Sequence, residues 1–330
     1  MFNKFRIYVF GLLMLLSLTA TAQQLSENAR ISLLTCSPGQ ELYARYGHTA
    51  IRICDPQNNI DAVFNYGIFD FNTEHFYWKF MRGETWYELG ATSYRWFMRE
   101  YDDTQRDVYE QVLNLTPTQC EAIWQALLIN YEPENRRYLY NFVFNNCATR
   151  PYWLIANTLG DSIRSSYTGC EGLTYRQFIR YYTGTHTWAN AGINLLFGRK
   201  ADRQMMGEQR LFMPEELMFF LNDARLSDGT PLVSKSHIAP FVIDATPWYL
   251  SWEFGMVLYF ILIAVISLID RRRKRRAKFI DWLFCIVYAM LLLLVAFLVF
   301  FSCHPLVGFG WRLLILPLVH LCARFVYILR

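Results

Sequence analysis

One reactive thiol is the first chemistry that the sequence indicates. Between residues 23 and 247 the chain has an odd number of cysteines, namely Cys36, Cys54, Cys120, Cys147 and Cys170. In an oxidising compartment, four of them would pair in disulfides and one would stay free. Cys147 is the best candidate for the free thiol, because it is expected at a helix N-terminus, where the helix dipole favours the thiolate. An inert buried cysteine or a disulfide partner is the alternative.

A histidine at the start of a predicted strand is the candidate base for this thiol. His48 precedes an alternating apolar and polar segment, residues 50–54. Turn-forming residues 55–59 and a second strand, residues 60–66, complete a predicted β-hairpin. A neutral imidazole can take the proton of a thiol, although a structural histidine is the commoner case. His75, His186 and His237 do not lie at the start of so clear a predicted strand.

Other common chemistries leave no signature in the chain. The sequence has no C-x-x-C or H-x-x-x-H spacing, so it predicts no metal site. It has no G-x-S-x-G elbow and no Walker A loop, and no cofactor is predicted. The Lys and Arg residues of segment 271–278 outweigh the whole net charge of +4. The rest of the chain is therefore not basic, which argues against nucleic-acid binding.

Hydropathy divides the chain into three parts. Residues 1–22 have the charged start, short apolar run and small-residue cleavage site of a secretory signal peptide, and an uncleaved anchor helix is the alternative. Residues 23–247 mix polar and apolar residues and can form a globular domain with its own core. Residues 248–330 are predicted to be transmembrane. Their apolar segments lie at about 249–269, 279–303 and 306–329, the last being a third span or a re-entrant segment.

Charge gives the orientation of these parts. The basic loop 271–278 between the first two spans is expected to stay in the cytoplasm. The globular domain then lies outside, on the side that the signal peptide implies. Aromatic residues at 76–78 and 247–249 are expected to seat this domain on the membrane interface, with core packing as the alternative. Because the hairpin is followed by helical segments, the predicted class is α+β, an antiparallel sheet with helices packed on it.

Four segments of the chain resemble those of one protein family from Gram-negative bacteria. They are residues 41–52 (ELYARYGHTAIR), 63–71 (VFNYGIFDF), 133–138 (PENRRY) and 145–150 (NNCATR), and His304-Pro305 adds a further similarity. The family is that of the lipoprotein N-acyltransferase Lnb, whose N-terminal periplasmic domain was long known only as a domain of unknown function. The family continues through more membrane segment than the 25 residues after Pro305, so the chain is expected to hold only part of the membrane half.

The order of histidine first and cysteine second is also similar to that of permuted papain-like (NlpC-like) thiol acyltransferases, such as lecithin retinol acyltransferase. This resemblance implies a third polar group on the strand that pairs with the histidine strand. If the hairpin turns near residue 57, His48 lies opposite Tyr66 and beside Asn65, which is the predicted third group. Asp61 and Asp70 are the alternatives, because a one-residue slip in register changes the side chain that faces His48.

Further residues are predicted to bind the substrate. The side chain of Asn146 is expected to join the backbone N–H of Cys147 in an oxyanion hole. Arg150 and Arg136, with Arg137, are candidates to bind a phospholipid phosphate, and ion pairs with Glu132 and Glu134 are the alternative. Predicted substrate contacts also include Tyr43 and His304, for which a plain loop residue is the alternative at His304.

The resemblance implies an acyltransferase of the bacterial inner membrane with its catalytic domain in the periplasm. A fatty acyl chain would pass from a phospholipid to Cys147 as a thioester. It would then pass to the N-terminal amine of a diacylglyceryl-cysteine lipoprotein. Two alternatives remain open: a periplasmic papain-like cysteine peptidase or amidase acting on cell-wall peptides, and a non-catalytic membrane assembly protein.

Overall fold

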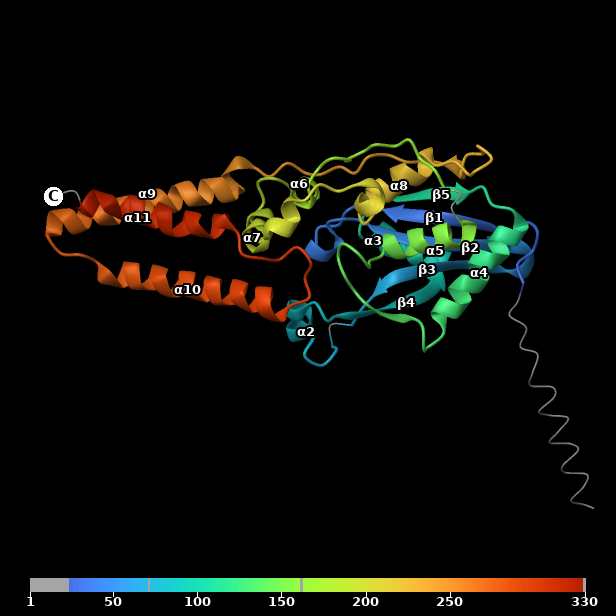
Figure 1. Ribbon diagram of the computed structural model, residues 1–330, viewed down its shortest axis with the longest axis horizontal. Coiled ribbons are helices and arrows are strands. Elements are labelled where there is room, and N and C mark those ends of the chain that lie inside the picture. Colours follow the sequence, from blue (N-terminus) through green and yellow to red (C-terminus); the bar gives the residue numbers. More distant parts are fainter. Residues whose placement is uncertain (1–23, 71, 161–162, 329–330) are drawn as a thin grey trace, which may run out of the picture.

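The chain forms a sheet-and-helix domain from which long helices extend as a rod (Figure 1). This arrangement is seen in a computed structural model, which describes residues 24–70, 72–160 and 163–328. The domain combines one sheet with helices packed on it, so the predicted α+β class is confirmed. The predicted signal peptide, residues 1–22, lies outside the described residues.

Seven strands form one sheet in the order β6-β4-β3-β2-β1-β5-β7, and every neighbouring pair is antiparallel. The strands are β1 (Arg30–Cys36), β2 (His48–Asp55), β3 (Ile60–Ile68), β4 (Trp86–Ser93), β5 (Val108–Leu113), β6 (Arg137–Leu139) and β7 (Val233–Ser236). β1 and β3 run toward the helical rod and β2 runs away from it (Figure 1). The ends of β1 and β3 and the start of β2 therefore meet at the end of the sheet nearest the rod. This end of the strands is called the sheet edge.

The predicted hairpin is the pair β2 and β3. A single 3₁₀ turn, Pro56–Asn58, connects the strands, and Asn59 closes it with a left-handed φ of 55°, which asparagine tolerates well. The register pairs Ile51 with Phe64. When this register is extended, Gly67 and not Tyr66 falls opposite His48. The hairpin is thus confirmed, but its expected register was wrong by one residue.

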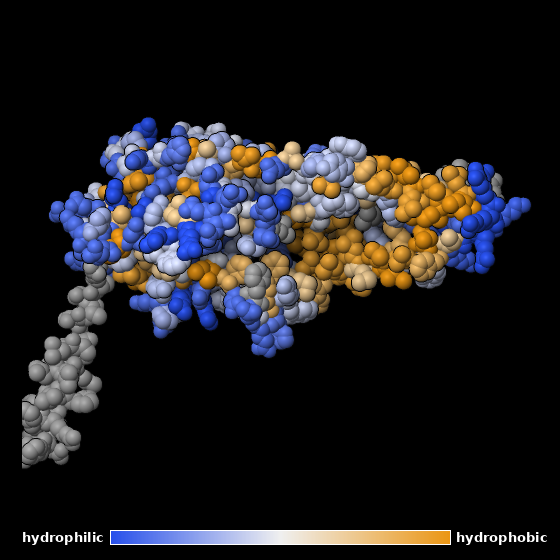
Figure 2. All heavy atoms as spheres, turned by 180° about the vertical axis from the view of Figure 1, so that it is seen from behind, coloured by the Kyte–Doolittle hydropathy of each residue, from blue (hydrophilic) through white to orange (hydrophobic). Residues whose placement is uncertain are grey.

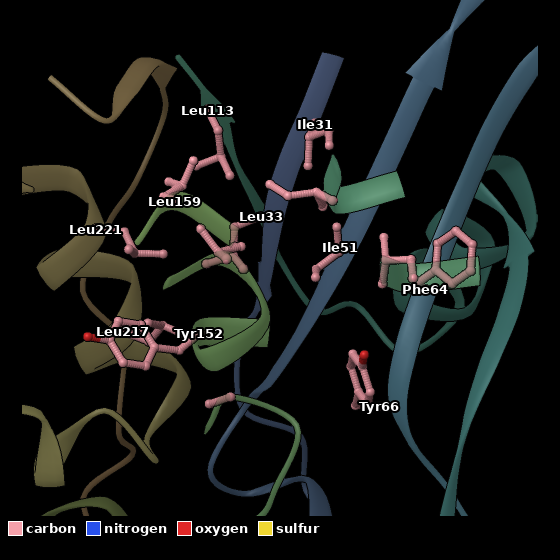
Figure 3. Packing of buried hydrophobic residues seen from close by; sticks show 14 of the residues in the cluster. Ile31, Leu33, Ile51, Phe64, Tyr66, Leu113, Tyr152, Leu159, Leu217 and Leu221 are labelled. Carbon is pink, nitrogen blue, oxygen red and sulfur yellow. The ribbon is translucent and has the colours of Figure 1, made fainter. Parts of the chain in front are cut away.

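Helices cover both faces of the sheet. On one face, apolar residues of β1, β2 and β3 pack against α4 (Pro117–Tyr131), α5 (Thr149–Leu159) and α8 (Pro214–Asp223) to form the main core (Figure 3). On the other face, Leu34, Ala50 and Val63 pack against Phe97 and Tyr101 of α3 (Tyr94–Asp103). Successive strand residues point to opposite faces, so alternation in the sequence supplies both cores.

A capping box fixes the start of α4. The Thr116 side chain accepts a hydrogen bond from Gln119 N–H, and the Gln119 side chain accepts one from Thr116 N–H. Pro117 occupies the first helical turn, where its missing N–H costs nothing. A capping box of this kind stabilises a helix by about 1 kcal/mol. The sequence Thr116-Pro117-Thr118-Gln119 carries this start signal.

A second core lies between the sheet and the rod. It is formed around α6 (Tyr175–Thr183) by large side chains that include Phe178, Tyr182, Phe212 and Phe241. Leu306, from the segment after the second long helix, belongs to the same cluster. Phe197, which follows α7 (Trp188–Leu196), forms a β-bridge with Val307. Apolar packing and backbone hydrogen bonds therefore join the domain to the membrane segment.

Two helices of the rod are long and apolar enough to cross a membrane, α9 (Trp252–Arg273) and α10 (Lys278–Phe301). Their exposed side chains form a continuous hydrophobic surface, which ends at the basic loop on the far side from the domain (Figure 2). α11 (Ile315–Ile328) is shorter, with 14 residues, and lies along α9 (Figure 1). The first two predicted spans are thus confirmed by length and composition, and the third segment forms a shorter helix.

A second contact fixes the domain to the outer end of α10. α2 (Phe76–Arg82) follows β3, and its Trp78 ring lies 5.0 Å from that of Phe297 in α10. The N–H of Cys303 donates a hydrogen bond to Arg82 O at 2.7 Å. β3 therefore leads directly from the sheet to the membrane end of a spanning helix.

Candidate active site

His48 and Asn65 are hydrogen-bonded at the edge of the sheet nearest the rod. His48 begins β2 and lies opposite Gly67 of β3. Asn65 lies two residues before Gly67 in the same strand, so the side chains of His48 and Asn65 are on the same face of the sheet. The distance between His48 Nε2 and Asn65 Oδ1 is 2.6 Å. An amide oxygen can only accept a hydrogen bond, so Nε2 carries the proton. The Nδ1 nitrogen is then the one that can accept a proton from a substrate or a nucleophile.

The side chains of His48, Asn65 and Cys147 converge on Gly67. A β-carbon placed on Gly67 would lie 3.0 Å from His48 Cε1, 3.6 Å from Asn65 Oδ1 and 3.8 Å from Cys147 Cβ. The φ of Gly67 is +154°, a value that residues with a side chain rarely adopt. Glycine at this position leaves the space in which the three groups meet. The structure thus brings together the thiol, the imidazole and the amide that the sequence singled out.

The alternative third groups are engaged elsewhere. Asp61 forms a salt bridge with Arg52, with 2.7 Å between Oδ1 and Nε. Asp70 Oδ1 accepts a hydrogen bond from Asn72 N–H at 2.8 Å. Of the three candidates, Asn65 is the one whose hydrogen bond to His48 is formed.

Cys147 lies two residues before the first residue of α5, close to the predicted position at a helix start. The Asn146 side chain organises this start: its Oδ1 accepts from Ala148 N–H and Thr149 N–H, both at 2.9 Å. Its Nδ2 donates to the carbonyl oxygens of Phe142 and Phe212, both at 2.8 Å. Both amide hydrogens are thereby used. The expectation that Asn146 donates to an oxyanion is wrong for this geometry, in which Asn146 positions the turn that carries Cys147.

Burial makes the thiol and the imidazole neutral. It raises the pKa of Cys147 to about 11, although Thr49 N–H and the N–H of Cys147 itself hydrogen-bond to the sulfur and oppose this shift. Burial likewise lowers the pKa of His48 to about 4, with the hydrogen bond to Asn65 acting in the opposite direction. The expected lowering of the thiol pKa by the helix dipole is therefore outweighed by desolvation. At neutral pH the site holds a thiol and a neutral base, and not a preformed ion pair.

The predicted disulfides are not formed. Every cysteine in the described part of the chain is free, including all five between residues 23 and 247. Cys36 ends β1 opposite His48 and is fully buried. Desolvation raises its pKa to about 12. The prediction of four paired cysteines was wrong. It was based on the odd number of cysteines, which says nothing of the distances between their side chains. Cys147 is the free thiol that meets both His48 and Asn65 at Gly67.

The predicted phosphate ligands differ in their surroundings. Arg150 donates from Nε to Asn145 Oδ1 at 2.8 Å, and its guanidinium carbon lies 3.9 Å from the Tyr138 ring centre. Among the described residues, no carboxylate forms a salt bridge with Arg150. Arg136 and Arg137 instead both approach Glu88 Oε2, at 3.5 and 3.6 Å, and not Glu132 or Glu134. Arg150 is thus the better-placed cation for an anionic ligand near Cys147.

The two other predicted substrate contacts, Tyr43 and His304, contact segments that follow β3. Tyr43 is exposed, and its ring packs edge-on against that of Phe69, which follows β3. The Nε2 of His304 hydrogen-bonds to Phe80 O in α2, at 3.0 Å. His304 therefore contacts the sheet-and-helix domain and helps to hold α2 against the end of α10.

The sequence did not indicate Gly67, or the tyrosines of the strands near Cys147, as site residues. A thiolate on Cys147 would raise the pKa values of Tyr87, Tyr138 and Tyr140, and the Arg150 guanidinium, three residues after Cys147, lies 3.9 Å from the Tyr138 ring centre. Tyr87 and Tyr138 are paired across β4 and β6. Tyr138 and Tyr140 are two residues apart, a spacing that in an extended segment places both rings on one face. This alternation was the signal that could have indicated them. In the part of the chain that the structure describes, no cluster of His, Cys, Asp and Glu could hold a metal ion.

These features define an α+β domain that is anchored by membrane helices and carries a cysteine, histidine and asparagine at its membrane-facing edge. The model of the Lnb N-terminal periplasmic domain matches residues 19–184, and that of the Lnb transmembrane domain matches residues 245–330. The chain belongs to the Lnb family. It is a membrane protein with a periplasmic part, and its family indicates a role in lipoprotein maturation. No curated protein and no solved structure matches the chain.

Proposed function

We propose that this protein is a lipoprotein N-acyltransferase of the inner membrane that works through a thioester on Cys147. The observation that carries the proposal is the convergence of Cys147, His48 and Asn65 on Gly67, at the sheet edge nearest the membrane helices. Such an arrangement of a nucleophile, a base and an orienting amide also supports the permuted papain-like class for the domain.

In the first half-reaction, His48 takes the thiol proton as the sulfur of Cys147 attacks an ester carbonyl of a phospholipid. A base with a low pKa and a thiol with a high pKa do not exchange this proton in the resting site. The transfer is therefore expected to accompany the attack. Loss of the lysophospholipid alkoxide, which takes the proton from His48, leaves an acyl-thioester on Cys147.

In the second half-reaction, the N-terminal amine of a diacylglyceryl-cysteine lipoprotein attacks the thioester. His48 accepts a proton from the amine, and the thiol of Cys147 is restored as the leaving group. The product is an amide. A thioester reacts more readily with amines than an oxygen ester does, so the covalent intermediate divides one slow reaction into two faster ones.

The position of the site fits substrates that stay in the outer leaflet. Tyr77 and Trp78 of α2 are 75% and 50% exposed, and Trp248, just before α9, is 70% exposed. Phe76 of the same cluster is buried in the domain instead. Exposed aromatic rings at this level favour the membrane–water interface. Arg150, which has no carboxylate partner among the described residues, supplies a cation for the phospholipid phosphate.

Mass spectrometry of a model lipoprotein tests the proposal. The lipoprotein is isolated from cells that carry the wild-type protein and from cells that lack it. We expect the mass of one acyl chain on the N-terminal cysteine only when the wild-type protein is present. An unmodified amine in both cases would contradict the transferase. Release of free peptide or fatty acid in place of transfer would favour the hydrolase, whose chemistry is the same up to the acyl-enzyme.

A further inference from the structure

Tyr138 is a buried residue near Cys147 whose hydroxyl group has no hydrogen-bond partner. It lies in β6, opposite Tyr87 of β4, and its side chain is 3% exposed. Among the described residues, nothing accepts from or donates to its hydroxyl oxygen. Burial of a hydroxyl without a hydrogen bond is unfavourable, and an unsatisfied group of this kind in a folded protein is often functional.

The packing around Tyr138 holds its ring in one place. Its ring centre lies 6.3 Å from that of Tyr66 and 6.4 Å from that of Tyr87. The Arg150 guanidinium covers the ring, with 3.9 Å between its central carbon and the ring centre. Arg150 belongs to α5, which begins just after Cys147. The helix that positions the thiol therefore also fixes the orientation of the tyrosine.

The ring of Tyr138 lies against Arg150, three residues after the cysteine that carries the thiol. Burial raises the pKa of Tyr138, and the next largest cause is a thiolate on Cys147, ahead of the effect of Arg150 in the opposite direction. Tyr138 thus stays protonated and can donate a hydrogen bond. Tyr66 makes a useful contrast, because its pKa is raised by burial but depends on Arg150 and not on Cys147.

We propose that Tyr138 is an oxyanion-hole donor for the tetrahedral intermediate on Cys147, acting together with the backbone N–H of Cys147. The inference rests on the thiol mechanism proposed above and assigns the second donor of that site. Asn146 is not available for this role, because its two amide hydrogens bind the Phe142 and Phe212 carbonyl groups. The orphan hydroxyl of Tyr138 has no such commitment.

The step is an addition followed by an elimination. As His48 takes the thiol proton, a sulfur electron pair of Cys147 forms the C–S bond, and the carbonyl π pair moves to oxygen to give the oxyanion. Tyr138 donates a hydrogen bond to this oxygen and keeps its proton. When the carbonyl reforms, the C–O bond to the lysophospholipid breaks, and the leaving alkoxide takes the proton that His48 received from the thiol. A donor aimed at an oxyanion in a dry site stabilises the transition state more than the ground state.

Two reactions of Cys147 separate this role from a structural one. Acylation by a p-nitrophenyl ester passes through an oxyanion, whereas alkylation by iodoacetamide is a direct displacement at carbon and forms none. In the full-length protein in lipid nanodiscs, we expect Tyr138→Phe to slow acylation of Cys147 by about 10²-fold. The alkylation rate of Cys147, followed by peptide mass spectrometry, should stay within about twofold.

Tyr66→Phe is the matched control, because it removes a buried hydroxyl from the same aromatic cluster. It should leave both rates close to those of the wild type. Equal acylation rates for Tyr138→Phe and the wild type would overturn the inference, and so would an equal fall in acylation and alkylation. Failure of the wild-type protein to acquire an acyl group on Cys147 would instead overturn the thiol mechanism, and this inference with it.

Discussion

Two polar clusters, one at the sheet edge nearest the rod and the other at the far end of the rod, each contain a histidine in a protein interior. At the sheet edge, His48 bonds to the neutral amide of Asn65 beside Cys147. At the inner end of the rod, His320 lies 3.3 Å from Asp281, and its ring stacks on Phe284 at 3.9 Å. One cluster is uncharged and the other is built from ions.

The inner cluster is built from ion pairs. The buried Arg324 approaches Asp270 at 3.0 Å and Asp281 at 2.9 Å, and His320 also bonds to Tyr259 at 2.8 Å. These contacts join α9, α10 and α11 where the basic loop begins. Charges inside a membrane segment are costly unless they are paired in this way. The ions of this cluster pair with one another and hold the three helices together.

The site at the sheet edge is left incomplete by contrast. The hydroxyl of Tyr138 has no partner among the described residues, and Arg150 has no carboxylate there. The thiol and imidazole are held neutral by burial. A polar cluster that lacks partners costs stability and is often retained for function. The sheet-edge cluster therefore has the features of a reactive site, and the inner cluster has those of a structural one.

The largest expected effect is that of Cys147→Ser. A serine hydroxyl is a much weaker acid than a thiol, so His48 cannot activate it in the same geometry. We expect lipoprotein N-acylation to fall by about 10⁴-fold, measured by mass spectrometry of the lipoprotein N-terminus. Cys54→Ser, a cysteine of β2 away from the site, should retain activity. Full activity of a folded Cys147→Ser protein would show that the sheet-edge cluster is not catalytic.

Gly67→Ala should be the next most damaging change. Its methyl group would meet His48 Cε1 at 3.0 Å, and a φ of +154° is unfavourable for alanine. We expect acylation of Cys147 to slow by about 10²-fold because the imidazole is displaced. Gly192→Ala in α7 is the control, since nothing lies within 4 Å of its new methyl group. Normal activity of Gly67→Ala would mean that the three side chains do not need this space.

The pH dependence of acylation tests the neutral partner of His48. Burial lowers the pKa of His48 to about 4, so the base is unprotonated above that pH and activity should be lost only as pH falls through this value. Asn65→Asp places a carboxylate beside the imidazole and favours its protonated form. The acid limb of the profile should therefore move to higher pH, with about tenfold lower activity at pH 6. An unchanged acid limb would mean that His48 is not the base of the reaction. Recovery of activity after return to pH 7 is the control that excludes irreversible unfolding by acid.

Arg324→Leu should have the smallest effect on chemistry and a large effect on stability. It would leave Asp270 and Asp281 without their shared cation, and breaking a buried pair costs about 3–5 kcal/mol. We expect a lower melting temperature in detergent, with activity per folded molecule unchanged. Arg271→Leu, at the exposed basic end of α9, is the matched control. A folded Arg324→Leu protein with impaired acylation would show that the two clusters are linked, and that the inner cluster does not serve stability alone.

Much of this arrangement was predictable from local signals. The hairpin, the capping box of α4 and the first two spanning helices follow from alternation, turn residues and hydropathy, which act over a few neighbouring residues. The choice of Cys147, His48 and Asn65 could also be made from the sequence, through the expected helix start, the position of the histidine at a strand start and the motif resemblance. The predicted phosphate ligand Arg136 could not be judged in this way, because its contact with Glu88 joins distant segments.

Sequence alone determined which groups this protein has for chemistry and on which kind of element each one lies. Tertiary structure decided their state: burial keeps the Cys147 thiol protonated, the hairpin register places Gly67 opposite His48, and packing occupies the Asn146 amide. The reason is that desolvation, register and hydrogen-bond occupancy depend on residues far apart in the chain. A helix start predicts a reactive cysteine, but only the folded surroundings decide how its proton is held.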